Sequence, residues 1–180
     1  GQKSQLWGCY ATIRDLMQNK ERIMTGSLER LVPRALDEDI GHGDLTTAYT
    51  VPEHSRCRAR LLAKESGVLS GLGAFRTAFE CLDAGISGWA SLSDGSPFAV
   101  GAEVVSFEGL SRAVLTAERV ALNFVQRLSG VATLTARYVE AVQGLHTRIC
   151  DTRKTAPLLR ALEKEAVRHG GGCNHRFNLS

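Results

Sequence analysis

A chain of 180 residues suffices for one ordinary domain or two small ones, and 43% hydrophobic with 23% charged residues allows a buried core. The net charge of +3 is too small to drive non-specific nucleic-acid binding, and no apolar run reaches the roughly 18 residues needed to span a membrane. Five scattered cysteines without a C-x-x-C pair argue against a disulfide framework or a zinc site, and favour a reducing, cytoplasmic compartment.

Residues 1–26 are predicted to be an extension to the fold. Their apolar side chains recur at spacings of three and four from Leu6 to Met17, which is typical of an amphipathic helix. Alternatively the segment lies upstream of a start at Met24. We assign it no function.

Residues 27–120 are predicted to form a small α+β sandwich domain. A helical stripe begins at Leu28 and is stopped at Gly41, and Asp44 is suited to a helix N-cap or a turn. The next expected elements are a strand over 56–64, a glycine-punctuated turn over 67–73, a helix over 74–82 with Leu82 facing inward, and strands near 89 and over 104–107. Short strands without a βαβ rhythm favour a sandwich.

Residues 121–180 have a different pattern and are predicted to begin an α/β barrel. The expected elements are a helix ending near 128, an interruption at 129–130, a helix over 131–142, a short strand within 148–155, a helix from about 157 through 167, and a possible second strand after the glycines at 170–172. Strands alternating with helices are the rhythm of a parallel sheet or barrel.

The segment DTRKT lies where the predicted strand gives way to a helix. Such junctions face the ligand in α/β folds, so Thr152, Arg153 and Lys154 are expected at a ligand site. Adjacent cations repel each other unless an anion lies between them. Arginine offers a flat fork to a carboxylate or phosphate, and lysine offers a point charge. The alternative is a solvated pair of loop cations.

His175 and Arg176 follow three glycines, which allow close backbone approach to a ligand or a neighbouring strand. Alone this signal is weak, because glycine-rich loops usually just turn and a single histidine is more often structural. Together with DTRKT on a neighbouring strand it predicts a basic pocket for a small polyanion. Cys173 and His175 lack metal-ligand spacing, and Arg119 reads as a surface cation on a helix.

Five segments, in this order, resemble the quinolinate phosphoribosyltransferases: EDIGHGDLTT, TAERVALNF, LSGVATLTARYV, DTRKTAP and LRALEKEAVRHGGGCNHR. The resemblance covers about residues 28–176, and DTRKT followed by GGG-x-NHR is highly specific. It implies an N-terminal α/β sandwich joined to an incomplete α/β barrel. It also implies transfer of phosphoribosyl from phosphoribosyl pyrophosphate to quinolinate, giving nicotinate mononucleotide, pyrophosphate and carbon dioxide in NAD biosynthesis.

The resemblance also implies roles for the basic residues. Arg153 and Lys154 would contact quinolinate or the diphosphate, with Thr152 beside them. His175 and Arg176 would bind the quinolinate carboxylates. No residue would act as a nucleophile, because catalysis would be positional and electrostatic.

Two further implications concern partners and cofactors. The family's counterpart of Arg119 reaches across a dimer interface into the partner's site, which implies a homodimer with shared active sites. The family requires Mg²⁺. Its acidic ligands follow a K-D-N-H stretch that would lie beyond Ser180, so no metal ligand is assigned here.

The sequence also departs from the family. Ala156 and Leu158 replace the usual threonine and glycine, and Glu165 stands where tyrosine is common. We expect the chain alone to be inactive, because it ends before the active site is complete. The alternatives are a non-catalytic truncated relative that serves as a dimerisation and anion-binding module, and a paralogue of the same fold with another substrate.

Overall fold

The computed structural model describes residues 28–179, so the predicted extension at 1–26 lies outside the described residues. Residues 28–40 are helical and end where predicted, because Gly41 has φ +55° and donates its N–H to the Asp37 carbonyl at 3.1 Å. Asp44 is the N-cap of α2 (Leu45–Thr50) and accepts the Thr47 N–H at 3.0 Å. The predicted helix stop and cap are both confirmed.

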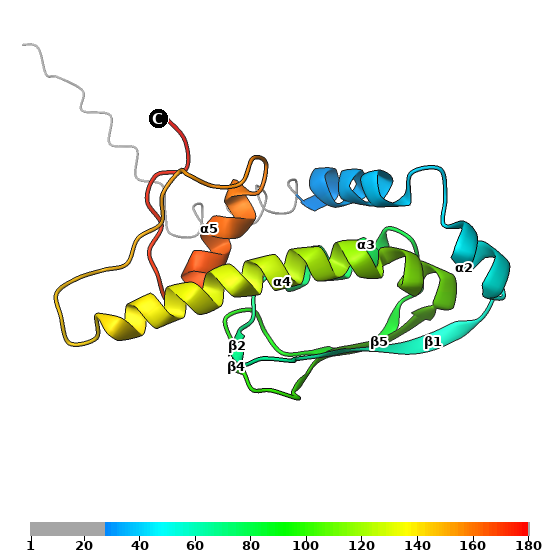
Figure 1. The fold of residues 1–180 in the computed structure, drawn as a ribbon, viewed down its shortest axis with the longest axis horizontal. Coiled ribbons are helices and arrows are strands. Elements are labelled where there is room, and N and C mark those ends of the chain that lie inside the picture. Colours follow the sequence, from blue (N-terminus) through cyan, green and yellow to red (C-terminus); the bar gives the residue numbers. More distant parts are fainter. Residues whose placement is uncertain (1–27, 180) are drawn as a thin grey trace, which may run out of the picture.

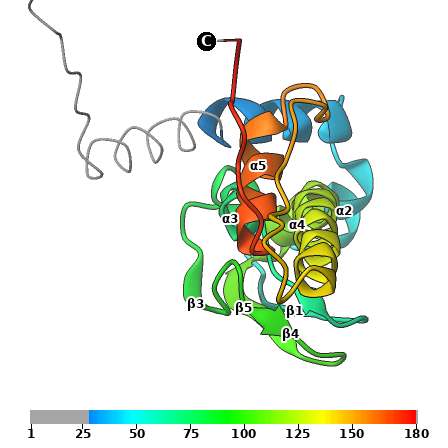
Figure 2. The ribbon, with the colours of Figure 1, turned by 90° about the vertical axis from the view of Figure 1, so that its left-hand side faces the viewer.

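One layer is an antiparallel sheet in the order β1-β5-β3 (Figure 2). Its strands are β1 (Arg56–Leu62), β3 (Ser87–Ser91) and β5 (Glu103–Leu110). Side chains along β1 alternate between exposed and half-buried, which is the period-two pattern that predicted this strand. The central strand β5 contributes Val104, Val105 and Phe107 to the core. The three predicted strands are confirmed, although β1 ends two residues earlier than expected.

The second layer consists of α3 (Leu72–Glu80) and α4 (Ser111–Ala141), which lie along the sheet (Figures 1 and 2). Four aromatic rings of α3 and the sheet pack with centroids 4.8–6.3 Å apart: Phe75, Phe79, Trp89 and Phe107. The predicted sandwich is therefore present. Leu82 was expected to face inward but is 37% exposed, because α3 ends at Glu80.

The prediction that residues 129–130 interrupt the long helix is wrong. α4 runs through them without a break. The Ser129 hydroxyl accepts the Ser70 N–H at 3.1 Å and donates to the Ser70 carbonyl at 3.2 Å. These contacts with a segment far away in sequence outweigh the weak helix propensity of a serine–glycine pair.

A third layer lies on the side of α4 away from the sheet (Figure 2), where α5 (Arg160–His169) packs. The expected start of this helix near residue 157 is wrong, because Leu158 has a left-handed φ of +66°. The two strands expected around it reduce to one parallel bridge between Cys150 and Cys173.

A second small sheet pairs β2 (Gly67–Val68) with β4 (Pro97–Phe98), and β2 lies inside the segment 67–73 that was predicted to be a turn. The mixture of helices and short strands confirms the predicted class, an α+β sandwich followed by the first part of an α/β unit. The predicted domain boundary between residues 120 and 121 falls within α4 and stays a prediction. None of the helices described is long and apolar enough to cross a membrane.

Candidate functional site

The two basic loops identified in the sequence lie side by side. We call residues 152–154 the first basic loop and residues 175–176 the second basic loop. The Asp151 N–H donates to the Cys173 carbonyl at 2.9 Å, and the Cys173 N–H donates to the Ile149 carbonyl at 2.8 Å. Because Cys150 and Cys173 pair in parallel, the two basic loops that follow them leave the bridge on the same side. The predicted adjacency is confirmed, while the roles of the side chains stay predictions.

A buried ion pair lies beneath the two loops. Lys164 of α5 is fully buried, and its Nζ lies 2.5 Å from Asp151 Oδ1 and 2.9 Å from the His175 carbonyl oxygen. The same Asp151 oxygen accepts the His175 N–H at 2.7 Å. Nothing in the sequence pattern singles out either member of this pair, and only its burial in α5 distinguishes Lys164 from the other basic residues.

A second buried acid fixes the segment between the first basic loop and α5. Glu163 Oε1 accepts Arg127 Nε at 3.0 Å and Arg127 Nη2 at 2.6 Å. Its other oxygen accepts the Ala156 N–H at 3.2 Å. One carboxylate thus connects α4, α5 and the loop that carries the DTRKT motif.

The side chains of the first basic loop differ in their surroundings. Thr152 is exposed, and its Oγ1 accepts the Lys154 N–H at 3.0 Å. Arg153 is half-buried, and its Nε is a buried donor without a hydrogen-bond partner. A buried donor left unpaired is costly, and an acceptor atom from a ligand would remove that cost. Lys154 and both residues of the second basic loop are exposed.

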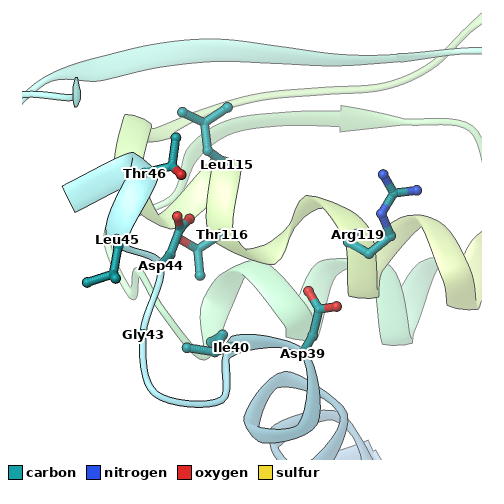
Figure 3. Close-up of a pocket in the computed structure, with 9 residues that line it drawn as sticks. All are labelled: Asp39, Ile40, Gly43, Asp44, Leu45, Thr46, Leu115, Thr116 and Arg119. Carbon is teal, nitrogen blue, oxygen red and sulfur yellow. The ribbon is translucent and has the colours of Figure 1, made fainter. Parts of the chain in front are cut away.

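Arg119 lies elsewhere, exposed on α4 in an open cleft of about 410 Å³ (Figure 3). Asp44 turns its carboxylate toward Thr116, whose hydroxyl donates to it at 2.9 Å, whereas the Arg119 guanidinium points away from that pair. Hydrogen bonds from Thr47, and then from Thr116, hold the pKa of Asp44 below its ordinary value. No residue of either basic loop lines this cleft, so the structure does not unite Arg119 with them within the described residues.

Metal-binding side chains do not gather in residues 28–179. No group of three His, Cys, Asp or Glu side chains there could hold a metal ion.

Comparison with known proteins gives consistent matches along the chain. The N-terminal domain model of quinolinate phosphoribosyl transferase matches residues 44–129, and the C-terminal domain model matches residues 131–180. The probable nicotinate-nucleotide pyrophosphorylase [carboxylating] of Bacillus subtilis is 43% identical over 152 residues, which are 84% of this chain and 52% of that protein. Quinolinate phosphoribosyltransferase [decarboxylating] 1 of Nicotiana glauca is 40% identical over 86% of this chain and 44% of its own length.

Solved structures agree with these matches. NadC from Streptococcus pyogenes superimposes with a TM-score of 0.82 and 44% identity, over 85% of this chain and 54% of that one. The nicotinate-nucleotide pyrophosphorylase from Francisella tularensis gives a TM-score of 0.80 and 38% identity, over 86% and 55% of the two chains. The chain spans about half the length of the curated relatives it matches.

Proposed function

Because the chain belongs to the quinolinate phosphoribosyltransferase family, we propose that the protein encoded by its complete reading frame is a phosphoribosyl-transferring enzyme. It moves the phosphoribosyl group of phosphoribosyl pyrophosphate onto the ring nitrogen of quinolinate. Pyrophosphate leaves from the ribose, and carbon dioxide leaves from the pyridine ring. The product is nicotinate mononucleotide, an intermediate of NAD biosynthesis. The names of the relatives support both the substrate and the decarboxylation.

The observation that carries this proposal is the pairing of the two basic loops. Arg153 and Lys154 lie on one loop, and His175 and Arg176 lie on its neighbour, whose backbone is held by Asp151. Quinolinate presents two adjacent carboxylates, and paired cationic loops match such a ligand. The unpartnered Arg153 Nε adds a donor that a carboxylate or phosphate oxygen can satisfy.

The chain's own residues would work by position and charge. The arginines hold the anionic substrates so that the ribose carbon and the ring nitrogen meet in a reactive geometry. The fixed cations balance charge as an oxocarbenium-like ribosyl centre forms. The pyridinium created by the transfer stabilises the carbanion that remains on the ring when the carboxylate beside the ring nitrogen leaves as carbon dioxide, and a proton from solvent then takes the place of that carboxylate. No residue is assigned as a nucleophile.

The remaining parts of the site would come from elsewhere. Arg119 would enter the active site of the partner in a homodimer, and its exposure in a cleft apart from the basic loops is compatible with that role. As the resemblance implies, the family's magnesium requirement would be met by acidic ligands outside the described residues. We place the enzyme in the cytoplasm.

The test is an assay of the protein encoded by the complete reading frame, with quinolinate, phosphoribosyl pyrophosphate and magnesium. Formation of nicotinate mononucleotide is expected. Arg153→Ala should raise the KM for quinolinate about tenfold or more, since one charge-assisted hydrogen bond contributes roughly 1.5–3 kcal/mol. Arg58→Ala, which removes an exposed arginine from β1, is the matched control. Absence of product, or the same quinolinate KM in both variants, would contradict the proposal.

A further inference from the structure

Lys164 is the most unusual side chain near the basic loops. Its side chain is 0% exposed and that of its partner Asp151 is 6% exposed, whereas lysine is almost never fully buried unless it is paired. Its ammonium also lies 4.9 Å from the centre of the Phe177 ring. The burial of this charged side chain therefore requires a physical explanation.

Stability alone is a poor reason. Removing two charges from water costs about as much as their mutual attraction returns, and apolar replacements of buried ion pairs are often as stable as the pair. A buried ion pair instead fixes positions, because each charge holds the groups that hydrogen-bond to it in one place. In this protein those atoms belong to the two basic loops.

The second basic loop is held on both sides of a single residue. Asp151 accepts the His175 N–H, and Lys164 donates to the His175 carbonyl. Asn174, with its amide oriented so that each atom meets a complementary partner, donates to Asp151 Oδ2 and to the Lys164 carbonyl, both at 2.8 Å. The backbone of His175 is thereby fixed, while its side chain and that of Arg176 stay exposed.

The first basic loop is fixed by the same pair. Asp151 is the residue immediately before Thr152, so the carboxylate that engages Lys164 also sets where the first basic loop begins. Neither Lys164 nor Asp151 is exposed enough to contact a substrate itself.

We propose that Lys164, through its ion pair with Asp151, is a positioning residue that sets the distance between the two basic loops and so determines the affinity for quinolinate. This inference rests on the proposed function. The pair acts through the loop residues and takes no part in the reaction.

The experiment uses Lys164→Met, Asp151→Asn and the double variant in the protein encoded by the complete reading frame. Each is compared with the wild type for melting temperature, for kcat and for the KM of quinolinate. Arg168→Met, which removes an exposed cation from the same helix, is the matched control. A merely structural role would reduce the amount of active enzyme, and hence the apparent kcat, without changing KM.

We expect Lys164→Met to raise the quinolinate KM at least tenfold and to lower the melting temperature. The double variant leaves no unpaired buried charge, so its melting temperature should recover while its KM stays raised. A double variant with the wild-type KM would overturn the inference. If the variants of Lys164 and Asp151 do not fold, Asn174→Ala takes their place. That substitution removes the Asn174 hydrogen bonds to Asp151 and to the Lys164 carbonyl but leaves the ion pair intact. An unchanged quinolinate KM in Asn174→Ala would also overturn the inference. A wild-type protein that forms no nicotinate mononucleotide would reject the proposed function, and the inference with it.

Discussion

Ser70 Oγ lies 2.8 Å from His169 Nδ1, although the two residues are 99 positions apart in the chain. The contact joins the segment after β2 to the last turn of α5, and Ser70 is only 1% exposed. On its other side, His169 Nε2 lies 3.6 Å from Glu165 Oε1. The third layer is therefore attached to the sandwich by a buried polar contact as well as by apolar packing.

Ser70→Ala tests how much this contact stabilises the fold. The substitution leaves His169 Nδ1 without its serine partner in a half-buried site, so we expect the free energy of unfolding to fall by about 1 kcal/mol. Denaturant unfolding measures the change. Ser93→Ala, at an exposed serine, is the control and should have little effect. Equal effects of the two substitutions would contradict a role for the contact.

Asp94 interacts with His169 and Glu165, and its ionisation is expected to make the stability of the fold depend on pH. Burial, and to a smaller extent the nearby Glu165 carboxylate, raise the pKa of Asp94 above its ordinary 3.8, against the opposing effects of the Leu72 N–H and His169. A raised pKa means that the folded state favours the proton. Stability is then lost as the pH rises from about 3.8 through the folded-state pKa. Asp94→Asn should therefore unfold at higher denaturant concentration at neutral pH, and the gain should vanish near pH 3.8.

For Asp83 we expect the opposite dependence of stability on pH, so it is the matched comparison for Asp94. Its two oxygens accept the Leu110 N–H at 2.7 Å and the Gly85 N–H at 2.8 Å, and the Leu110 bond is the main cause that lowers the pKa of Asp83 below 3.8. Stability from this group is present above 3.8 and is lost as the pH falls through the folded-state pKa. Asp83→Asn turns an amide donor toward one of the two N–H groups, so we expect a loss of roughly 1–3 kcal/mol at pH 7. In unfolding curves across pH, a loss of stability in both variants at neutral pH would refute the Asp94 assignment, and a gain in both would refute the Asp83 assignment.

The features that the sequence predicted well need only near neighbours. Asp44 caps a helix through an N–H three residues away, and Gly41 stops a helix through its own backbone angle. The alternation along β1 likewise follows from the strand's own geometry. In each case the residues that make the structure are contained in a short stretch of sequence.

The features that the sequence missed depend on distant partners. The serine–glycine pair in α4 reads as a break until Ser129 is seen bonded to Ser70, 59 residues away. Lys164 reads as one more surface cation until α5 is folded against α4 and turns it toward Asp151. The adjacency of the basic loops was predictable from the α/β rhythm, but the ion pair that holds them was not.

Replacing glycine by alanine should have opposite effects on stability at Gly130 and at Gly170. Gly130 is exposed within α4, and a Cβ there would meet nothing within 4 Å, so Gly130→Ala should raise the free energy of unfolding by about 0.5–1 kcal/mol through helix propensity. At Gly170 a Cβ would overlap the Ala132 carbonyl oxygen and lie 2.7 Å from Thr135 Cβ. Gly170→Ala should therefore destabilise the packing of α5 on α4 by about 1–3 kcal/mol. Thermal unfolding of the two variants side by side checks the signs, and a stabilising Gly170→Ala would show that the contact yields easily.

The final prediction concerns the dimer. If Arg119 enters the partner's site, a mixed dimer of Arg119→Ala and Arg153→Ala chains has one site that lacks both arginines and one intact site. With quinolinate well below its KM, a tenfold rise in KM leaves about a tenth of the activity in each single variant. Coexpression of the two chains in equal amounts should then restore about a quarter of the wild-type activity above this residual level, because half of the dimers are mixed and each has one working site. The control mixes Arg153→Ala with Arg176→Ala. Both of those residues lie on the paired basic loops of one chain, so every site is defective and the activity should stay at the residual level. Tagged chains purified in tandem establish that the mixed dimers form. Inactive mixed dimers of the Arg119 and Arg153 variants would place Arg119 within its own subunit's site or outside the reaction altogether.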